Sequence, residues 1–93
     1  MAATRTERKG LRLLGHTDLA GHGNCGEGLS LQQLPGGRRV LWIAHEGEGV
    51  DVTAVDVTDP RKPRVIHQSF LPHHDVRSNS LMVVDNLMLV ARQ

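Results

Sequence analysis

Short runs of alternating apolar and polar residues follow one another along this chain, and turn residues separate the runs at close intervals. Alternation with a period of two is typical of half-buried strands, and no long window repeats apolar residues at helical spacing. We therefore expect an all-β fold of antiparallel strands. The predicted strands are Leu11–Leu14, Gly28–Gln32, Val40–His45, Val50–Val57, Arg64–Phe70, Ser80–Val84 and Leu87–Ala91.

The segment between Thr58 and Arg64 predicts a rigid hairpin corner. Pro60 fixes its own φ for the second position of a turn, and the carboxylate of Asp59 can accept hydrogen bonds from the backbone N–H groups that follow. Pro63 can begin the next strand. We expect a hairpin between Thr53–Thr58 and Arg64–Phe70.

Two further turns are predicted. The sequence LPGGRR joins two of the runs at residues 34–39, and Asp85 with Asn86 forms a two-residue hairpin link in which Asn tolerates a positive φ. Within Val50–Val57 the apolar positions change from even to odd numbers. Either the paired strand begins near Thr53, or a β-bulge intervenes.

The chain also repeats itself. The segment that begins at Gly28 aligns with the segment that begins at Asn79, so that Leu31 falls on Leu81, 50 residues later. The segment from Leu13 can likewise be laid on the segment from Val65. A unit of about four strands that recurs every 40 to 50 residues is typical of a β-propeller blade.

The length allows about one and three-quarter such units, whereas a propeller closes with about four to eight. We expect an N-terminal fragment of a longer protein, with assembly of several copies as the alternative. Residues 1–10 are charged and without period and predict a disordered leader, which leaves residues 11–93 as the partial propeller.

The stretch from residue 40 to residue 68 resembles the LVIVD-repeat proteins, whose blades run from an apolar strand through a second strand into a D-[VI]-[ST]-D-P-x-x-P corner and then a further strand. The resemblance covers about a third of the chain. It implies a β-propeller, often many-bladed and bacterial or archaeal, and no catalytic residue. A more distant likeness is to selenium-binding-protein-type propellers, some of which are metal-dependent oxidoreductases with histidine ligands. The matching positions are Val40–Ala44, Val55, Asp56, Val57, Thr58, Asp59, Pro60 and Pro63.

Composition excludes several classes of partner. Eleven Lys and Arg residues against ten Asp and Glu residues give a net charge of +1. The basic residues are scattered, so we expect no nucleic-acid partner. The longest apolar run, Val40–Ala44, is far shorter than a membrane helix, and the N-terminus is polar where a signal peptide would be apolar. Cys25 is the only cysteine. These features predict a soluble cytoplasmic protein.

Three loops follow strands that run in the same direction and are therefore expected to open on one face of the propeller. Their histidine, thiol and carboxylate groups are ligand types that transition metals accept, although such side chains also bond loop backbone. The candidate metal ligands are His22, Cys25, His73 and His74. The wider ligand face adds Glu27, His45, Glu46, Asp75 and Arg77.

We expect a scaffold or binding module for an undefined ligand or protein, with a metal-dependent propeller enzyme as the competing hypothesis. Cys25 activated by a histidine would be a nucleophile, but a loop thiol is more often inert. The G-x-G-x-x-G pattern at Gly21 lacks the helix that a dinucleotide site requires.

Overall fold

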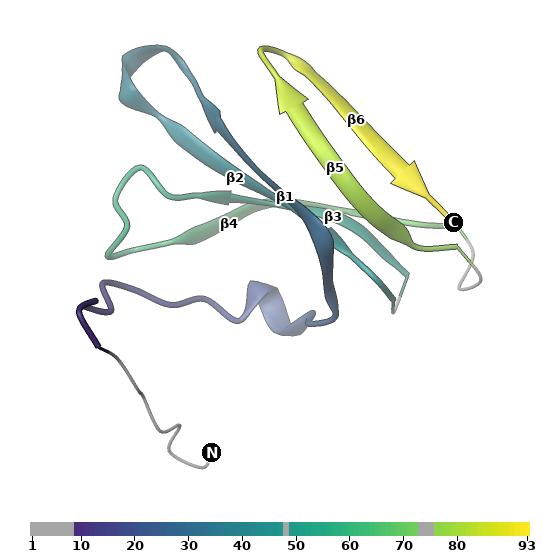
Figure 1. The fold of residues 1–93 in the computed structure, drawn as a ribbon, viewed down its shortest axis with the longest axis horizontal. Coiled ribbons are helices and arrows are strands. Elements are labelled where there is room, and N and C mark those ends of the chain that lie inside the picture. Colours follow the sequence, from purple (N-terminus) through teal and green to yellow (C-terminus); the bar gives the residue numbers. More distant parts are fainter. Residues whose placement is uncertain (1–8, 48, 73–75) are drawn as a thin grey trace.

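The computed structural model of the chain describes residues 9–47, 49–72 and 76–93, whose regular secondary structure is almost entirely β-strand (Figure 1). Two single-turn 3-10 helices accompany the strands, so the predicted all-β class is confirmed. The elements are η1 (Leu19–Gly21), β1 (Cys25–Gln33), η2 (Pro35–Gly37), β2 (Arg39–His45), β3 (Val50–Asp56), β4 (Arg64–Phe70), β5 (Ser78–Val84) and β6 (Leu87–Arg92).

The strands form two antiparallel sheets. The first has the order β1-β2-β3-β4, so each strand pairs with its neighbour in the sequence, and the second is the hairpin β5-β6. No helix in the described ranges has the length and apolar character needed to cross a membrane.

The predicted strand Leu11–Leu14 is wrong. These residues have no regular secondary structure and pair with no strand, and Leu11 is 80% exposed. The segment instead passes over the corner after β3, because Gly15 lies against the backbone of Pro60 and Arg61. A short apolar run without a pairing partner cannot satisfy the backbone groups of a strand. The repeat that aligned this run with β4 therefore has no structural counterpart, and the predicted leader falls mostly on residues 1–8, outside the described residues.

The core lies around β3, where every residue from Val50 to Val55 is buried. This strand is central in its sheet and covered on both faces, so alternation no longer separates an inside from an outside. The pairing of β3 with β4 shifts register between Val50 and Thr53. The bulge is thus the correct one of the two alternatives that the change of phase left open, and the strand begins at Val50.

The Asp-Pro corner forms as predicted. The backbone N–H of Lys62 donates to the carbonyl of Asp59 over 2.9 Å, which closes a turn with Pro60 at its second position. The Asp59 carboxylate accepts from the N–H of Arg61 over 3.0 Å, and β4 begins directly after Pro63. Proline geometry and a local Asp hydrogen bond are sufficient to set this corner.

The hairpin link between β5 and β6 also forms, with one correction. Asp85, and not Asn86, takes the positive φ, at 52°. At the other predicted turn, Gly36 and Gly37 have φ values of 79° and 80°, which glycine adopts without steric cost.

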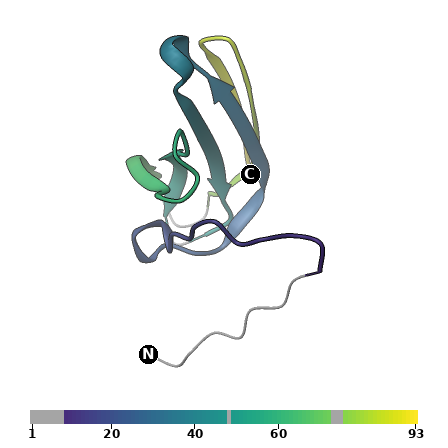
Figure 2. The same ribbon diagram turned by 90° about the vertical axis from the view of Figure 1, so that its left-hand side faces the viewer.

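The second sheet packs on one face of the first, with β5 running beside β1 (Figures 1 and 2). The approach is so close that a Cβ on Gly28 would lie 2.5 Å from the backbone nitrogen of Leu81 and 2.9 Å from the Cβ of Ala44. Only glycine fits at this position, because any side chain would overlap the backbone of β5.

Hydrogen bonds also join the two sheets. The hydroxyl of Ser30 accepts from the backbone N–H of Val83 over 3.0 Å. The side-chain amide of Gln32 donates to the carbonyl of Asp85 over 2.8 Å, and its oxygen accepts from the indole of Trp42 over 2.9 Å. Even-numbered residues of β1 therefore face the second sheet, and odd-numbered residues face away from it.

Candidate functional site at the loop end

Several connecting segments meet at one end of the two sheets, as the sequence predicts for its polar loops. The N–H of Glu46 donates to the carbonyl of Asn24 over 2.6 Å, and the N–H of Leu71 donates to Gly49 over the same distance. Gly26 lies against the carbonyls of residues 78 and 79. We call this region the loop end, and within the described residues it comprises 22–27, 45–47, 49, 70–72 and 76–79.

His45 lies at the last position of β2 and is fully buried. Its Nδ1 is 2.8 Å from the carbonyl oxygen of Gly23, and its Nε2 is 2.7 Å from the hydroxyl of Thr53. A carbonyl can only accept, so Nδ1 carries the hydrogen of that bond, while Nε2 forms the second hydrogen bond with the Thr53 hydroxyl.

The hydrogen-bond chain continues from Thr53 into the segment before β1. The side-chain amide of Gln68 donates to the Thr53 hydroxyl over 3.0 Å and to the carbonyl of Leu19 over 2.9 Å. Every side-chain donor named in this hydrogen-bond network meets an acceptor, as is usual for buried polar groups. Both ring nitrogens of His45 are therefore occupied, and the predicted ligand residue instead holds the segment 19–23 against the sheet.

Asp51 forms a second buried polar cluster at the bulge in β3. Its carboxylate accepts hydrogen bonds from the hydroxyl of Ser78 in β5, from Ser69 in β4 over 3.4 Å, and from the guanidinium of Arg92 in β6. The shortest distance from Arg92 to the carboxylate is 2.7 Å. One carboxylate thus connects three strands across both sheets.

Burial of Asp51 acts to raise its pKa, but the hydrogen bonds from Arg92 and Ser78 outweigh burial and lower the pKa from its ordinary value of 3.8. Ser78 donates to a carboxylate that a guanidinium also neutralises. This arrangement fixes the carboxylate in place and does not activate the serine as a nucleophile.

The other predicted site residues that the structure describes lie at or beside the loop end without contacting a common point. The His22 ring meets the ring of Phe70 edge-on, with centroids 5.9 Å apart. Cys25 is exposed and pairs with His45 in the β1-β2 ladder. Glu27 and Glu46 are also exposed.

Arg77, directly before β5, forms hydrogen bonds with Gln93, directly after β6. Its backbone N–H donates to the carbonyl of Gln93 over 2.8 Å, and its guanidinium donates to the side chain of Gln93 over 3.3 Å. These bonds extend the β5-β6 ladder by one residue pair.

His73, His74 and Asp75 lie outside the described residues. Within the described ranges, no group of three or more His, Cys, Asp and Glu side chains is placed to hold a metal ion. The metal site with His22, Cys25, His73 and His74 therefore stays a prediction.

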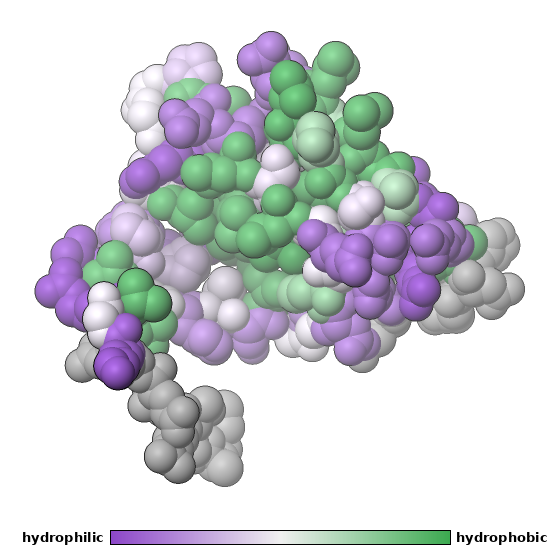
Figure 3. Space-filling model, viewed as in Figure 1, coloured by the Kyte–Doolittle hydropathy of each residue, from purple (hydrophilic) through white to green (hydrophobic). Residues whose placement is uncertain are grey.

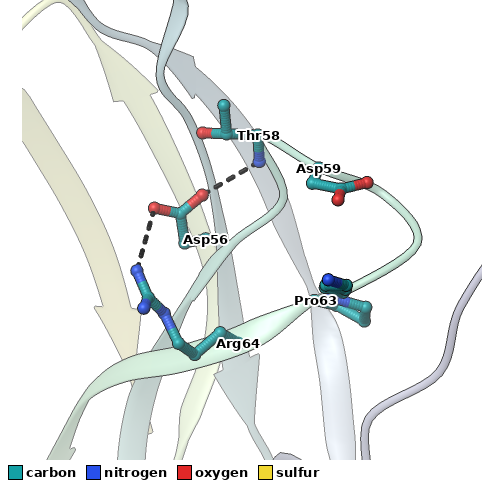
Figure 4. A pocket seen from close by; sticks show the side chains of 6 residues that line it. Asp56, Thr58, Asp59, Pro63 and Arg64 are labelled. Atoms are coloured by element: carbon teal, nitrogen blue, oxygen red, sulfur yellow. Dashed lines mark hydrogen bonds and ion pairs between the residues drawn. The ribbon is translucent and has the colours of Figure 1, made fainter.

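A separate hollow of about 450 Å³ lies at the Asp-Pro corner, between Asp56 and Lys62 (Figure 4). Asp56 accepts from the N–H of Thr58 over 2.9 Å and forms ion pairs with Arg38 at 3.4 Å and Arg64 at 3.8 Å. The hydrogen bonds from Thr58 are the main reason why the pKa of Asp56 is lowered. The carboxylate of Asp56 therefore stabilises the corner.

Apart from His45, the residues of the buried networks are not predicted from the sequence, namely Asp51, Thr53, Gln68, Ser69, Ser78 and Arg92. One signal was visible, because Asp51 is a carboxylate in an otherwise apolar strand. Its partners Ser78 and Arg92 are 27 and 41 residues away, so their pairing depends on how the sheets stack.

Comparison of the chain with protein-family models, with curated proteins and with solved structures gives no match.

Proposed function

We propose that this chain is a protein-binding repeat module of the β-propeller type, related to the LVIVD-repeat proteins that residues 40–68 resemble. Three features support the proposal. The first sheet has four antiparallel strands in sequence order. A second sheet packs on one face of the first. The hairpins β1-β2 and β5-β6 align in sequence at a separation of 50 residues.

The observation that carries the proposal is the exposed apolar surface of the second sheet. Met82 pairs with Leu89 and Val84 pairs with Leu87, so all four side chains share one face of the hairpin. Their exposed fractions are 60% for Met82, 58% for Val84, 76% for Leu87 and 74% for Leu89. Figure 3 shows hydrophobic side chains gathered over this part of the molecule. Contiguous apolar surface of this kind marks an interaction site.

We call this surface the outer face of β5-β6. A hollow of about 420 Å³ lies beside the hairpin and is lined from both of its faces, by Met82 and Leu89 of the outer face, by Leu81 and Val90 of the opposite face, and by Ser80 and Ala91. Apolar lining with few polar groups suits a packed protein surface, whereas a charged or polar ligand would find few partners here. The loop end, with exposed Glu27, Glu46 and Arg77, is the second surface of the same module and suits a polar ligand.

The test is the double substitution Met82→Lys with Leu89→Lys, studied at concentrations at which light scattering gives the mass of one chain. If the outer face is a free binding surface, the free energy of unfolding should change by no more than about 0.5 kcal/mol per residue. The folded parent chain should bind the dye anilinonaphthalene sulfonate, and the double variant should bind much less.

A destabilisation of about 2–5 kcal/mol would place these side chains in a packed core and contradict the proposal. The same conclusion would follow if the folded parent chain bound no dye.

Metal analysis separates this proposal from the metal-dependent enzyme. About one transition metal per chain after mild purification, lost on changing His73 and His74 to Ala, would support the enzyme. A folded sample without metal would support the binding module.

A further inference from the structure

The chain has a second apolar surface, on the side of β1-β2 turned away from β5. Leu29 pairs with Ile43 and Leu31 with Leu41, so these four side chains share one face. Leu29 is 63% exposed and Leu31 is 48% exposed. We call this surface the free face of β1-β2.

We propose that a second copy of this chain packs its outer face of β5-β6 onto the free face of β1-β2, so that copies associate head to tail. The inference rests on the proposed function, because it names the partner that the outer face binds. It follows from an interface that each chain already contains.

Within one chain, the face of β1 that carries Gly28 and Ser30 packs on β5. The internal repeat places Ser30 on Ser80 and Leu31 on Leu81. Because Ser30 and Leu31 point to opposite faces, the outer face of β5-β6 corresponds to the packed face of β1-β2. The free face of β1-β2 corresponds in turn to the inner face of β5-β6. Each chain therefore carries one such interface and two exposed surfaces that correspond to its two halves.

Part of the free face of β1-β2 is covered by the chain itself. The carbonyls of Leu19 and Gly23 bond Gln68 and His45, so the segment before β1 covers the first sheet on the side of β3 and β4. Ile43 is only 8% exposed and Leu41 is half-buried, so the part that remains open on this side is chiefly Leu29 and Leu31 of β1.

The repeat predicts a specific hydrogen bond across the contact. Inside one chain, the Ser30 hydroxyl accepts from the N–H of Val83, and Val83 aligns with Gln33. The hydroxyl of Ser80 in one copy should accept from the N–H of Gln33 in the next. Gln33 lies on β1, an edge strand of the first sheet, where unpaired backbone groups attract a partner.

Because the two faces differ, this contact is heterologous, and repeated use of it produces a closed ring or an open filament. An alternative arrangement, in which two outer faces pack on each other, is isologous and stops at a dimer. The two arrangements respond differently to substitutions on a single face.

Light scattering of purified chains tests the proposal. Leu29→Lys blocks the free face and Leu89→Lys blocks the outer face. Leu11→Lys is the control, because it changes an even more exposed leucine that lies outside both hairpins. Circular dichroism and Trp42 fluorescence establish that each variant is folded. We expect the parent chain and the control to associate, whereas Leu29→Lys and Leu89→Lys each give the mass of one chain.

A mixture of the two blocked variants is the decisive sample. The intact outer face of Leu29→Lys can bind the intact free face of Leu89→Lys, so the mass should rise about twofold and no further. Association of Leu29→Lys alone, or a mixture that stays at the mass of one chain, would overturn the head-to-tail contact.

A folded parent chain that keeps the mass of one chain at all concentrations would also overturn it. That result would leave the outer face to a different protein partner and would not affect the proposed function. The dye and unfolding experiments above test the proposed function separately.

Discussion

The two sheets of this protein use polar and apolar residues in opposite ways. In the four-stranded sheet the central strand is buried from Val50 to Val55, and the polar side chains of His45, Asp51 and Thr53 are enclosed with their partners. In the two-stranded sheet one face is apolar and exposed. A hairpin of two strands is marginal in water on its own, so β5-β6 depends on its packing against β1. The four-stranded sheet therefore has a buried interior, whereas the hairpin β5-β6 leaves one apolar face exposed.

The largest effect is expected where the sheets touch. A side chain at Gly28 would overlap the backbone of β5, with Leu81 nitrogen only 2.5 Å from the new Cβ. We expect Gly28→Val to destabilise the chain by about 3 kcal/mol and to separate β5-β6 from β1. Urea unfolding followed by Trp42 fluorescence measures the loss.

Gly23→Ala is the matched control, because a Cβ there meets nothing within 4 Å. It should leave the stability unchanged or slightly higher. Equal stability of the Gly28 variant and the control would show that the two sheets do not touch at this point.

A smaller loss is expected inside the first sheet. Thr53→Val keeps the shape but removes the hydroxyl that joins His45 to Gln68, which leaves buried groups without partners. We expect a destabilisation of about 2 kcal/mol. In a double-mutant cycle with Gln68→Leu, the two losses should add to more than the loss of the double variant, with a coupling above about 0.5 kcal/mol. Additive losses would contradict the hydrogen-bond chain.

The link between Asp51 and the second sheet should make the chain sensitive to acid. Because its pKa is lower in the folded state than the ordinary 3.8, the unfolded chain takes up the proton first as the pH falls. The stabilisation is complete above about pH 4 and is lost as the pH falls through the folded-state pKa. Asp51→Asn should cost about 1–2 kcal/mol at neutral pH, since Arg92 is half exposed and its charge is partly screened.

Asp85→Asn makes the same change at an exposed turn where Asn accepts the positive φ. It should change the stability by less than about 0.5 kcal/mol and keep the acid sensitivity of the parent chain. The measurement is the unfolding midpoint of the parent and of both variants between pH 2 and pH 7. If the stability of Asp51→Asn fell with pH as steeply as that of the parent, Asp51 would not be the cause of the acid sensitivity.

The smallest effect is expected from Ser30→Ala. The substitution removes one acceptor for the N–H of Val83 and leaves the packing at Gly28 intact. We expect a loss of about 0.5–1 kcal/mol and faster hydrogen exchange at the Val83 amide. Unchanged exchange at Val83 would show that this hydrogen bond does not form in solution.

Local chemistry explains what the sequence predicts correctly. Short apolar or alternating runs between turn residues place the strands from β2 to β6, and the proline and aspartate of the corner set its turn without help from distant residues. The start of β1 is different. The predicted strand begins at Gly28, yet pairing of Cys25 with His45 extends it through a glycine-rich stretch. Here the neighbouring strand decides, and local propensity does not.

The buried networks escape sequence analysis for the same reason. His45 stands at a strand end next to a polar loop, which suggests a ligand residue. The carbonyl that occupies its Nδ1 belongs to Gly23, 22 residues earlier. The prediction of a strand at Leu11–Leu14 is wrong because an apolar run forms a strand only where a partner strand is available.

The central claim is that β5-β6 stacks on β1 through Gly28, and nuclear Overhauser contacts test it most directly. In an isotope-labelled sample, the account predicts a strong contact between an α-proton of Gly28 and the amide proton of Leu81, beside the contacts within each sheet. If the contacts within both sheets were present and the contact from Gly28 to Leu81 were missing, the stacked arrangement would be contradicted, and the repeat interface inferred from it would lose its basis.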